Sequence, residues 1–257
     1  MLTWFNQNYL QPNPEKFQFI LFHNAVQFSN KSMKVGNMLL EPLESVKLLG
    51  VHVDCQLNFN VHISETCKLA GKQLSALGRL ANILSTEDKY VLFECFILSH
   101  FNYCPVVWHC CNISDMRKIE KVQKRALRYV FKDYSSSYTE LRQKASKPLL
   151  YVQRLRLILL EVYKIVHKIG PRYLYKMFNF KEMSYDLRNS NTIIPFKYNT
   201  MRHGKKSIRF VGAKIWNMLS NELRETMDFN AFKRFVMIWQ GPNCTCFNCE
   251  FCSLNQM

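Results

Sequence analysis

Acidic residues are scarce in this chain of 257 residues. Only 19 Asp and Glu accompany 35 Lys and Arg, which leaves a formal net charge of +16. The deficit is deepest in residues 101–180, where five acids accompany 16 basic residues. This imbalance favours a polyanionic partner such as nucleic acid or an anionic membrane surface. A basic surface that binds nothing is the alternative.

Long uninterrupted hydrophobic runs are also missing. The longest apolar stretch, Val91 to Trp108, contains Glu94, His100 and Asn102, which make it too polar for a membrane span. The amino terminus lacks the basic start and the continuous apolar core of a signal peptide. These absences predict an intracellular protein of the nucleus or cytoplasm that has no membrane partner.

Motifs of several common enzyme classes are absent as well. The eight glycines are spread singly, so no glycine-rich phosphate loop occurs. None of the seven histidines pairs with a cysteine or an acid in a pattern typical of a nucleophilic triad or a metal site. Six of the ten cysteines are scattered in apolar surroundings, and we expect most of them to be small buried hydrophobes in a reducing compartment: Cys55, Cys67, Cys95, Cys104, Cys110 and Cys111.

The only convincing β-structure is predicted near the amino terminus. Residues 17–22 read FQFILF and alternate as a strand does, and residues 46–54, VKLLGVHVD, form a second strand-like run. The polar residues between the two runs predict a connection or a hairpin extension. Before them, residues 2–10 predict a short helix that Pro12 and Pro14 end.

Helices are predicted for most of the remaining chain. From Ile63 onward the apolar residues recur every three or four positions, as on one face of a helix. The predicted helices begin at Ile63, after the caps Ser85 and Thr86, at Ser114-Asp115 and at Leu150, and two more lie near 212–225 and 228–239. The fold class is therefore α+β, mostly α, with a small β-hairpin portion at the amino terminus.

A row of basic residues follows the helix that begins at Ser114, on the side opposite its apolar face. The row consists of Arg117, Lys121, Lys124 and Arg128, with Lys118 and Arg125 beside it. The spacing suits contacts along a phosphate backbone, which depend on salt and not on nucleotide sequence. A solvated helix face without a partner is the competing interpretation.

Five long runs carry a family resemblance. They are WFNQNYLQPNPEKFQFILF at 4–22, SVKLLGVHVDCQLNFNVHI at 45–63, ILSHFNYCPVVWHCC at 97–111, IEKVQKRALRYVFKDYSSSYTELR at 119–142 and IRFVGAKIWNMLSNEL at 208–223. In this order they resemble the polymerase protein of non-long-terminal-repeat retrotransposons, the jockey-like mobile elements. The runs are similar to the carboxyl-terminal part of its reverse transcriptase, from the end of the palm through the thumb and beyond.

The resemblance implies a division of the chain into parts. These are a partial palm and primer grip (1–62), a helical thumb-like domain (63–178), a linker or extended arm (179–210), a carboxyl-terminal helical segment (211–240) and a cysteine-rich tail (241–257). By the same resemblance, residues 45–63 contain the primer-grip strand pair with its Leu-Gly turn. Leu49 and Gly50 then lie at the primer grip, where a small residue lets the backbone approach the primer. A tight strand twist that requires glycine is the alternative explanation for Gly50.

The acidic centre of such a polymerase is missing from this sequence. The parent enzymes are understood to hold two Mg²⁺ ions with palm aspartates, part of them in an aromatic-x-Asp-Asp turn, and no such turn occurs here. Asp54 is a lone acid after a strand, and Glu87-Asp88 lies at a predicted helix start. Phosphoryl transfer requires paired cations on clustered oxygen ligands. We therefore expect no catalytic residue in this chain, which would begin inside the palm, just past the catalytic turn.

The tail contains a cluster of four cysteines. Cys244, Cys246, Cys249 and Cys252 lie within nine residues, and four thiolates in tetrahedral geometry suit Zn²⁺. The spacing is unusual, because zinc modules commonly separate two ligand pairs by a longer loop. An unliganded, redox-labile tail is the alternative.

Three functional hypotheses remain from the sequence. The first is a truncated RNA-directed DNA polymerase that is inactive alone and binds RNA or DNA without sequence preference. The second is an active enzyme whose catalytic carboxylates the sequence motifs do not reveal, or an enzyme completed by a partner that supplies the palm. The third is a helical protein-interaction module in which the basic charge is incidental.

Overall fold

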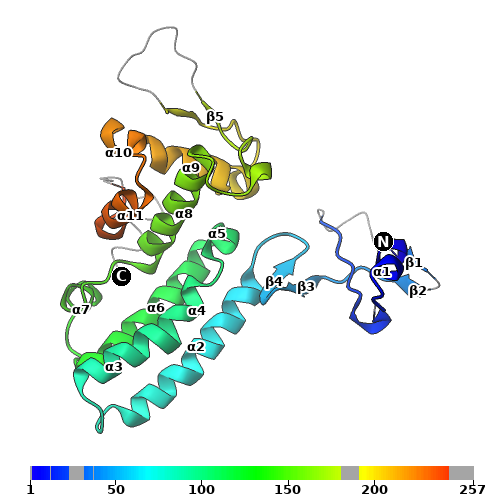
Figure 1. Cartoon of the computed structure of the whole chain (residues 1–257). Coiled ribbons are helices and arrows are strands. Elements are labelled where there is room, and N and C mark those ends of the chain that lie inside the picture. Colours follow the sequence, from blue (N-terminus) through cyan, green and yellow to red (C-terminus); the bar gives the residue numbers. More distant parts are fainter. Residues whose placement is uncertain (1, 12, 23–31, 37, 181–190, 243–257) are drawn as a thin grey trace. The chain divides into compact units, whose positions relative to one another are not determined.

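The computed structural model describes residues 2–11, 13–22, 32–36, 38–180 and 191–242 (Figure 1). Helices dominate, and the strands form small antiparallel sheets of two strands each. The predicted class, α+β and mostly α, is confirmed at this level. The chain divides into two compact units, Met1–Glu65 and Thr66–Met257.

The first unit contains short elements only. Two antiparallel hairpins form within it, and in the second of them Ser45 pairs with Asp54 and Leu48 with Val51. Its elements are α1 (Leu2–Gln7), the 3-10 helix η1 (Pro14–Lys16), β1 (Met33–Val35), β2 (Met38–Leu40), β3 (Ser45–Leu48) and β4 (Val51–Asp54).

The strand predictions for this unit were partly wrong. Residues 17–22 form no strand, and only Phe19 makes an isolated bridge, to Pro42. Residues 46–54 are not one strand, because the backbone turns at Leu49 and Gly50, with φ of 46° and 85°. The strand pair with a Leu-Gly turn that the resemblance implies is present as β3 and β4. Positive φ at both central residues matches the twist of a two-residue hairpin turn, and Gly50 adopts it without steric cost. The turn chemistry therefore outweighed the continuous apolar pattern.

Asp54 organises the loop that leads out of this hairpin. Its Oδ1 accepts backbone N–H groups of Gln56 and Asn58, at 3.1 and 2.9 Å, and its Oδ2 accepts that of Phe59 at 2.6 Å. A carboxylate that accepts several backbone donors fixes a turn as an Asx motif does. The carboxylate of Asp54 therefore stabilises the local backbone of this loop.

The second unit is built from helices. They are α2 (Asn60–Leu80, which starts in the first unit), α3 (Thr86–Leu92), the π-helix η2 (Phe93–Leu98), α4 (Ser99–Asn102), α5 (Pro105–Trp108), α6 (Ile113–Phe131), α7 (Tyr138–Lys144), α8 (Leu150–Val166), η3 (Arg172–Leu174), η4 (Met201–Lys205), α9 (Ile208–Asn217), α10 (Asn221–Glu225) and α11 (Phe229–Ile238). Between η3 and η4, the strands β5 (Asn179–Phe180) and β6 (Ile193–Ile194) pair antiparallel.

Helix caps agree in part with the sequence. The Ser85 hydroxyl accepts the backbone N–H of Asp88 at 3.0 Å, so the predicted cap of α3 is confirmed. Helix α6 begins at Ile113, one residue before the predicted start at Ser114, and the side chain of its cap Asn112 accepts the N–H of Asp115 at 2.8 Å.

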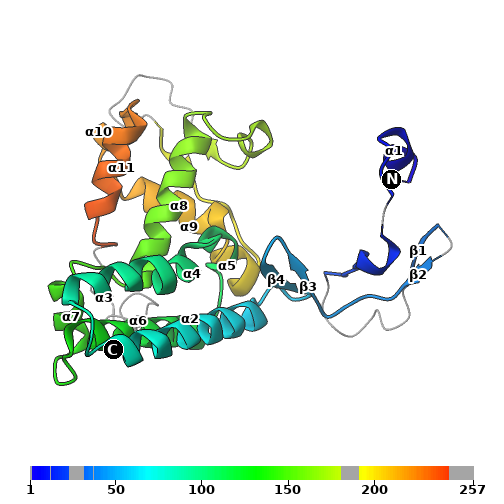
Figure 2. The ribbon, with the colours of Figure 1, turned by 60° about the horizontal axis from the view of Figure 1, so that its bottom comes forward.

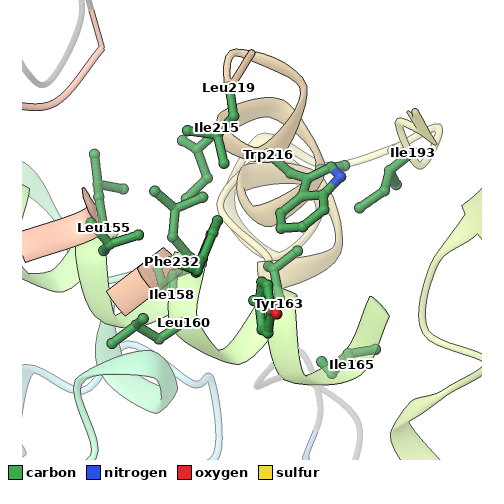
Figure 3. Packing of buried hydrophobic residues seen from close by; sticks show 14 of the residues in the cluster. Leu155, Ile158, Leu160, Tyr163, Ile165, Ile193, Ile215, Trp216, Leu219 and Phe232 are labelled. Carbon is green, nitrogen blue, oxygen red and sulfur yellow. The ribbon is translucent and has the colours of Figure 1, made fainter. Parts of the chain in front are cut away.

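One hydrophobic core cluster of the second unit lies between α8, α9 and α11. Figure 3 shows Tyr163 of α8, Trp216 of α9 and Phe232 of α11 together at its centre. The ring centroids of Tyr163 and Phe232 are 4.4 Å apart. The Tyr163 hydroxyl donates to the carbonyl of Thr226, and the Trp216 indole N–H donates to that of Asn191. The polar tips of these buried rings are thus satisfied.

The segment expected to be a linker or extended arm, 179–210, contributes to this core. Ile193 is fully buried, and its backbone exchanges hydrogen bonds with the side-chain amide of Asn217. The many polar residues of the segment predicted a linker. A single buried isoleucine and an asparagine clamp suffice to hold β6 against α9.

The cysteines are less buried than expected. Of the six scattered cysteines only Cys111 is buried, whereas Cys95 and Cys104 are exposed. The prediction of mostly buried thiols was therefore wrong, because an apolar neighbourhood in sequence includes both faces of a helix. The four cysteines of the tail, Cys244, Cys246, Cys249 and Cys252, lie outside the described residues.

Candidate nucleic-acid interface

The basic side chains of α6 differ in exposure. Arg117, Lys118, Lys121 and Arg125 are exposed, whereas Lys124 and Arg128 are half-buried. The exposed row of α6 therefore consists of Arg117, Lys121 and Arg125. It shares its first two residues with the predicted row, which continued to Lys124 and Arg128. Lys118 shares this side and its ammonium lies 2.6 Å from the carboxylate of Asp115.

Helix α2 lies alongside α6 and runs in the same direction. A Cβ placed on Gly78 of α2 would lie 3.4 Å from the ring of Tyr129 of α6. Eleven residues earlier on both helices, Cys67 interacts electrostatically with Lys118. The two contacts are separated by the same number of residues in the same direction on both helices, so α2 and α6 are parallel. Figure 2 shows α2 and α6 next to each other.

Three further cations lie on the outer side of α2. Lys68, Lys72 and Arg79 are exposed. Lys68 comes directly after Cys67, and Arg79 comes directly after Gly78. Cys67 and Gly78 both face α6. The side chains of successive helical residues point about 100° apart, so these cations stand at the outer edge of the groove between α2 and α6. We define the two-helix basic face as Lys68, Lys72 and Arg79 with Arg117, Lys118, Lys121 and Arg125.

Acids are nearly absent from this face. No acid occurs between Thr66 and Leu80, and the first acid before that stretch, Glu65, is half-buried. The two acids of α6, Asp115 and Glu120, are both buried, with exposed fractions of 1% and 0%. Within these two stretches the exposed charges are therefore positive, and the buried Asp115 pairs with Lys118.

A buried polar network holds α6 in place. The Glu120 carboxylate accepts the Tyr138 hydroxyl at 2.6 Å and the backbone N–H groups of Leu150 and Tyr151 at 3.3 and 2.9 Å. Glu120 thereby caps α8, which has no side-chain cap of its own. Burial raises the pKa of Glu120, while these donors and Arg154 lower it. The network joins the basic helix to α7 and α8.

Arg154 supplies the positive charge of this network without hydrogen bonds of its own. It is 1% exposed, and none of its guanidinium nitrogens has a partner among the described residues. The guanidinium lies 5.1 Å from the ring of Trp108 and 5.7 Å from that of Tyr151. Aromatic faces and the nearby Glu120 charge therefore stabilise this cation.

The thiol of Cys67 is not set up for reaction despite its basic neighbourhood. Burial raises its pKa to about 11, although Lys118 acts in the opposite direction. At neutral pH the protonated thiol dominates, and it is the thiolate that acts as nucleophile. Cys67 therefore serves as a packing residue between α2 and α6.

The predicted site residues divide between the two units. Leu49 and Gly50 form the hairpin turn of the first unit, and the six basic residues of α6 lie in the second. Lys68, Lys72 and Arg79 of α2 were not predicted, because the sequence reading of α2 followed only its apolar face. The sequence does contain a signal for them: the three cations are spaced four and seven residues apart, as on one side of a helix.

The described residues contain neither a candidate metal site nor a membrane-spanning helix. No group of three or more His, Cys, Asp or Glu side chains could hold a metal ion within those ranges. In the same ranges, no helix is long and apolar enough to cross a membrane. Comparison of the chain with protein-family models, curated proteins and solved structures gave no significant match in any of the three.

Proposed function

We propose that the chain corresponds to the carboxyl-terminal part of a non-long-terminal-repeat retrotransposon reverse transcriptase, without its catalytic aspartates, and that it binds RNA or DNA non-specifically. The two-helix basic face carries this proposal. Its seven cations project from two parallel helices, and the acids of α6 are buried beneath it. In this reading β3 and β4 are the end of a palm, and the helices from α2 onward are thumb-like.

The arrangement suits a phosphate backbone. Cations in register along two adjacent helices can neutralise successive phosphates, and each neutralised phosphate releases condensed counterions. Seven such contacts would give a slope of log K against log salt of about 5 to 6 in magnitude. No side chain of the face is fixed for base readout, so we expect affinity without sequence preference.

Polymerase activity is not expected from this chain alone. The sequence has no aromatic-x-Asp-Asp turn. Asp54 is engaged with three backbone donors, and Asp88 lies at the amino end of α3 beside its cap Ser85. A primer-extension assay with Mg²⁺ should therefore show no incorporation of deoxynucleotides, and incorporation would contradict the proposal.

Binding is tested by fluorescence anisotropy with labelled RNA and DNA strands between 50 and about 200 mM salt, a range over which six or more contacts weaken affinity about 10³-fold or more. The test variant combines Lys72→Gln, Lys121→Gln and Arg125→Gln. The matched control removes the same charges from α9 and α11 by Lys214→Gln, Lys233→Gln and Arg234→Gln, all at exposed positions.

The two triple variants should behave differently. The variant of the two-helix basic face should lose affinity and about 2 to 3 units of salt slope, because each lost phosphate contact removes nearly one unit. The control should retain most of the slope. Equal losses in the two variants would mean that net charge, and not this face, determines binding.

A protein-interaction module is the second candidate, favoured by the exposed apolar side chains of α3, η2 and the residue after α4. Val91, Phe96 and Tyr103 are 56%, 53% and 49% exposed. Docking through such residues responds little to salt, in contrast to phosphate contacts. A partner whose affinity is unchanged between low and physiological salt would support this candidate.

A further inference from the structure

A cleft of about 360 Å³ opens between the end of α4, the connection from α7 to α8, α8 and α11. Its lining includes Ser146, Lys147, Arg156, Leu157, Leu160 and Met237. Clefts that hold small organic ligands measure roughly 300 to 1,000 Å³, so this one accepts a small molecule. No lining residue belongs to the two-helix basic face.

Arg156 is the charged group of the cleft. Its exposed fraction is only 8%, and in the described part of the chain its one hydrogen bond runs from Nε to the carbonyl of Trp239, at 2.7 Å. No carboxylate pairs with it there, and burial alone lowers its pKa. Arginine stays protonated, so the Nη1 and Nη2 donors remain available as a fork for an oxyanion.

Two other polar side chains of the cleft, Lys147 and Gln153, are already matched. The ammonium of Lys147 pairs with the carboxylate of Glu94 and lies 5.6 Å from the ring of Tyr90. The amide of Gln153 donates to Asn102 at 2.7 Å. Arg156 therefore carries the uncompensated charge of the site.

The remaining wall is apolar. Leu160 is buried, Leu157 is half-buried and Met237, on α11, is 54% exposed. We propose that this cleft binds a small ligand that carries an oxyanion, phosphate or carboxylate, on an apolar group. The anion engages Arg156, and the apolar group covers Leu157, Leu160 and Met237.

Titration of the full chain with four probes, followed by ligand-observed NMR, tests the proposal. The probes are phenyl phosphate, benzoate, inorganic phosphate and phenol. Phenyl phosphate, benzoate or both should bind at least about tenfold more tightly than inorganic phosphate and phenol, since only they combine the two features. Preference between the first two identifies phosphate or carboxylate as the natural group.

Three variants place the binding in the cleft. Arg156→Gln should weaken the best probe at least about tenfold, because a charge-assisted hydrogen-bond pair is lost. Met237→Glu keeps Arg156 and its bond to Trp239 while adding a repulsive charge at an exposed position, and it should weaken binding similarly in a folded protein. Arg172→Gln, at an exposed arginine outside the cleft, should have no effect.

Two results would overturn the proposal. One is equal binding of all four probes, and the other is an unchanged affinity in Met237→Glu. The affinity of the two-helix basic face for RNA and DNA should be the same in Met237→Glu as in the wild type, so the two sites are tested independently.

Discussion

The two units of the molecule differ in how well they bury their apolar residues. In the first unit the buried side chains of the described residues are Val51, Phe59, His62 and Ile63, all close to the start of α2. Large apolar residues such as Tyr9 are nearly fully exposed there. In the second unit α8, α9 and α11 pack around one hydrophobic core cluster.

This difference has a structural cause. Each hairpin of the first unit is a sheet of two strands, which is marginally stable in water unless another element covers it. Amphipathic helices cover one another, as α8, α9 and α11 do. The stability of the chain therefore resides in the second unit, which also carries the two-helix basic face.

A pair of tryptophans offers the largest test of this contrast. Trp216 in the second unit is 0% exposed, and Trp4 in the first is 57% exposed. Trp216→Ala should lower the free energy of unfolding by about 3 to 5 kcal/mol, because it leaves a cavity and frees the Asn191 carbonyl. Urea denaturation followed by circular dichroism measures this change.

Trp4→Ala is the matched control. It should change the free energy of unfolding by no more than about 0.5 kcal/mol, as substitutions on a surface usually do. A similar loss in both variants would show that the first unit has a core of its own, and the contrast would fail.

The Glu120 network offers the next test. Glu120→Gln removes the charge that offsets Arg154 and weakens the cap of α8, so the free energy of unfolding should fall by about 3 kcal/mol. Glu161→Gln breaks a half-exposed pair with Lys164 and should cost at most about 1 kcal/mol. Equal effects of the two substitutions in urea denaturation would remove any special role for Glu120.

Much of the second unit could be predicted from the sequence. The spacing of apolar residues located α2, α6 and α8, because each helix buries one face and the period of 3.6 residues is visible along the chain. The hairpins were harder. Nothing in FQFILF distinguishes a paired strand from an extended segment without a partner, since pairing depends on residues far away.

The basic residues of α6 could be predicted from the sequence, whereas their association with those of α2 could not, because pairing of distant segments is again involved. The basic row of α6 is local and was found, although α6 is rotated so that Arg125 is outermost instead of Lys124. The contribution of α2 depends on which helix packs beside α6, and that contact is made by Gly78 and Tyr129, which are 51 residues apart. Periodicity shows that a face exists but not which neighbour extends it.

Acid pH provides the most specific test of the packed unit, with the smallest effect per pH unit. His109 is 4% exposed and stacks on Tyr151. Burial, with Arg154 and Lys206 nearby, lowers its pKa from 6.5 to about 3. Between these two values the unfolded chain binds a proton that the folded chain does not. The free energy of unfolding should therefore fall as the pH is lowered from 6.5 toward 3, by at most about 1.4 kcal/mol per pH unit from this residue.

His109→Phe isolates this contribution. Phenylalanine keeps a ring against Tyr151 but cannot be protonated, so the free energy of unfolding of the variant should depend less steeply on pH between 6.5 and 3. His203→Gln, at an exposed histidine, should leave the wild-type slope unchanged. Denaturation curves at several pH values measure all three slopes. If His109→Phe retained the wild-type slope, the acid sensitivity would have to come from other histidines with a lowered pKa, such as His62 in the first unit and His167 in the second.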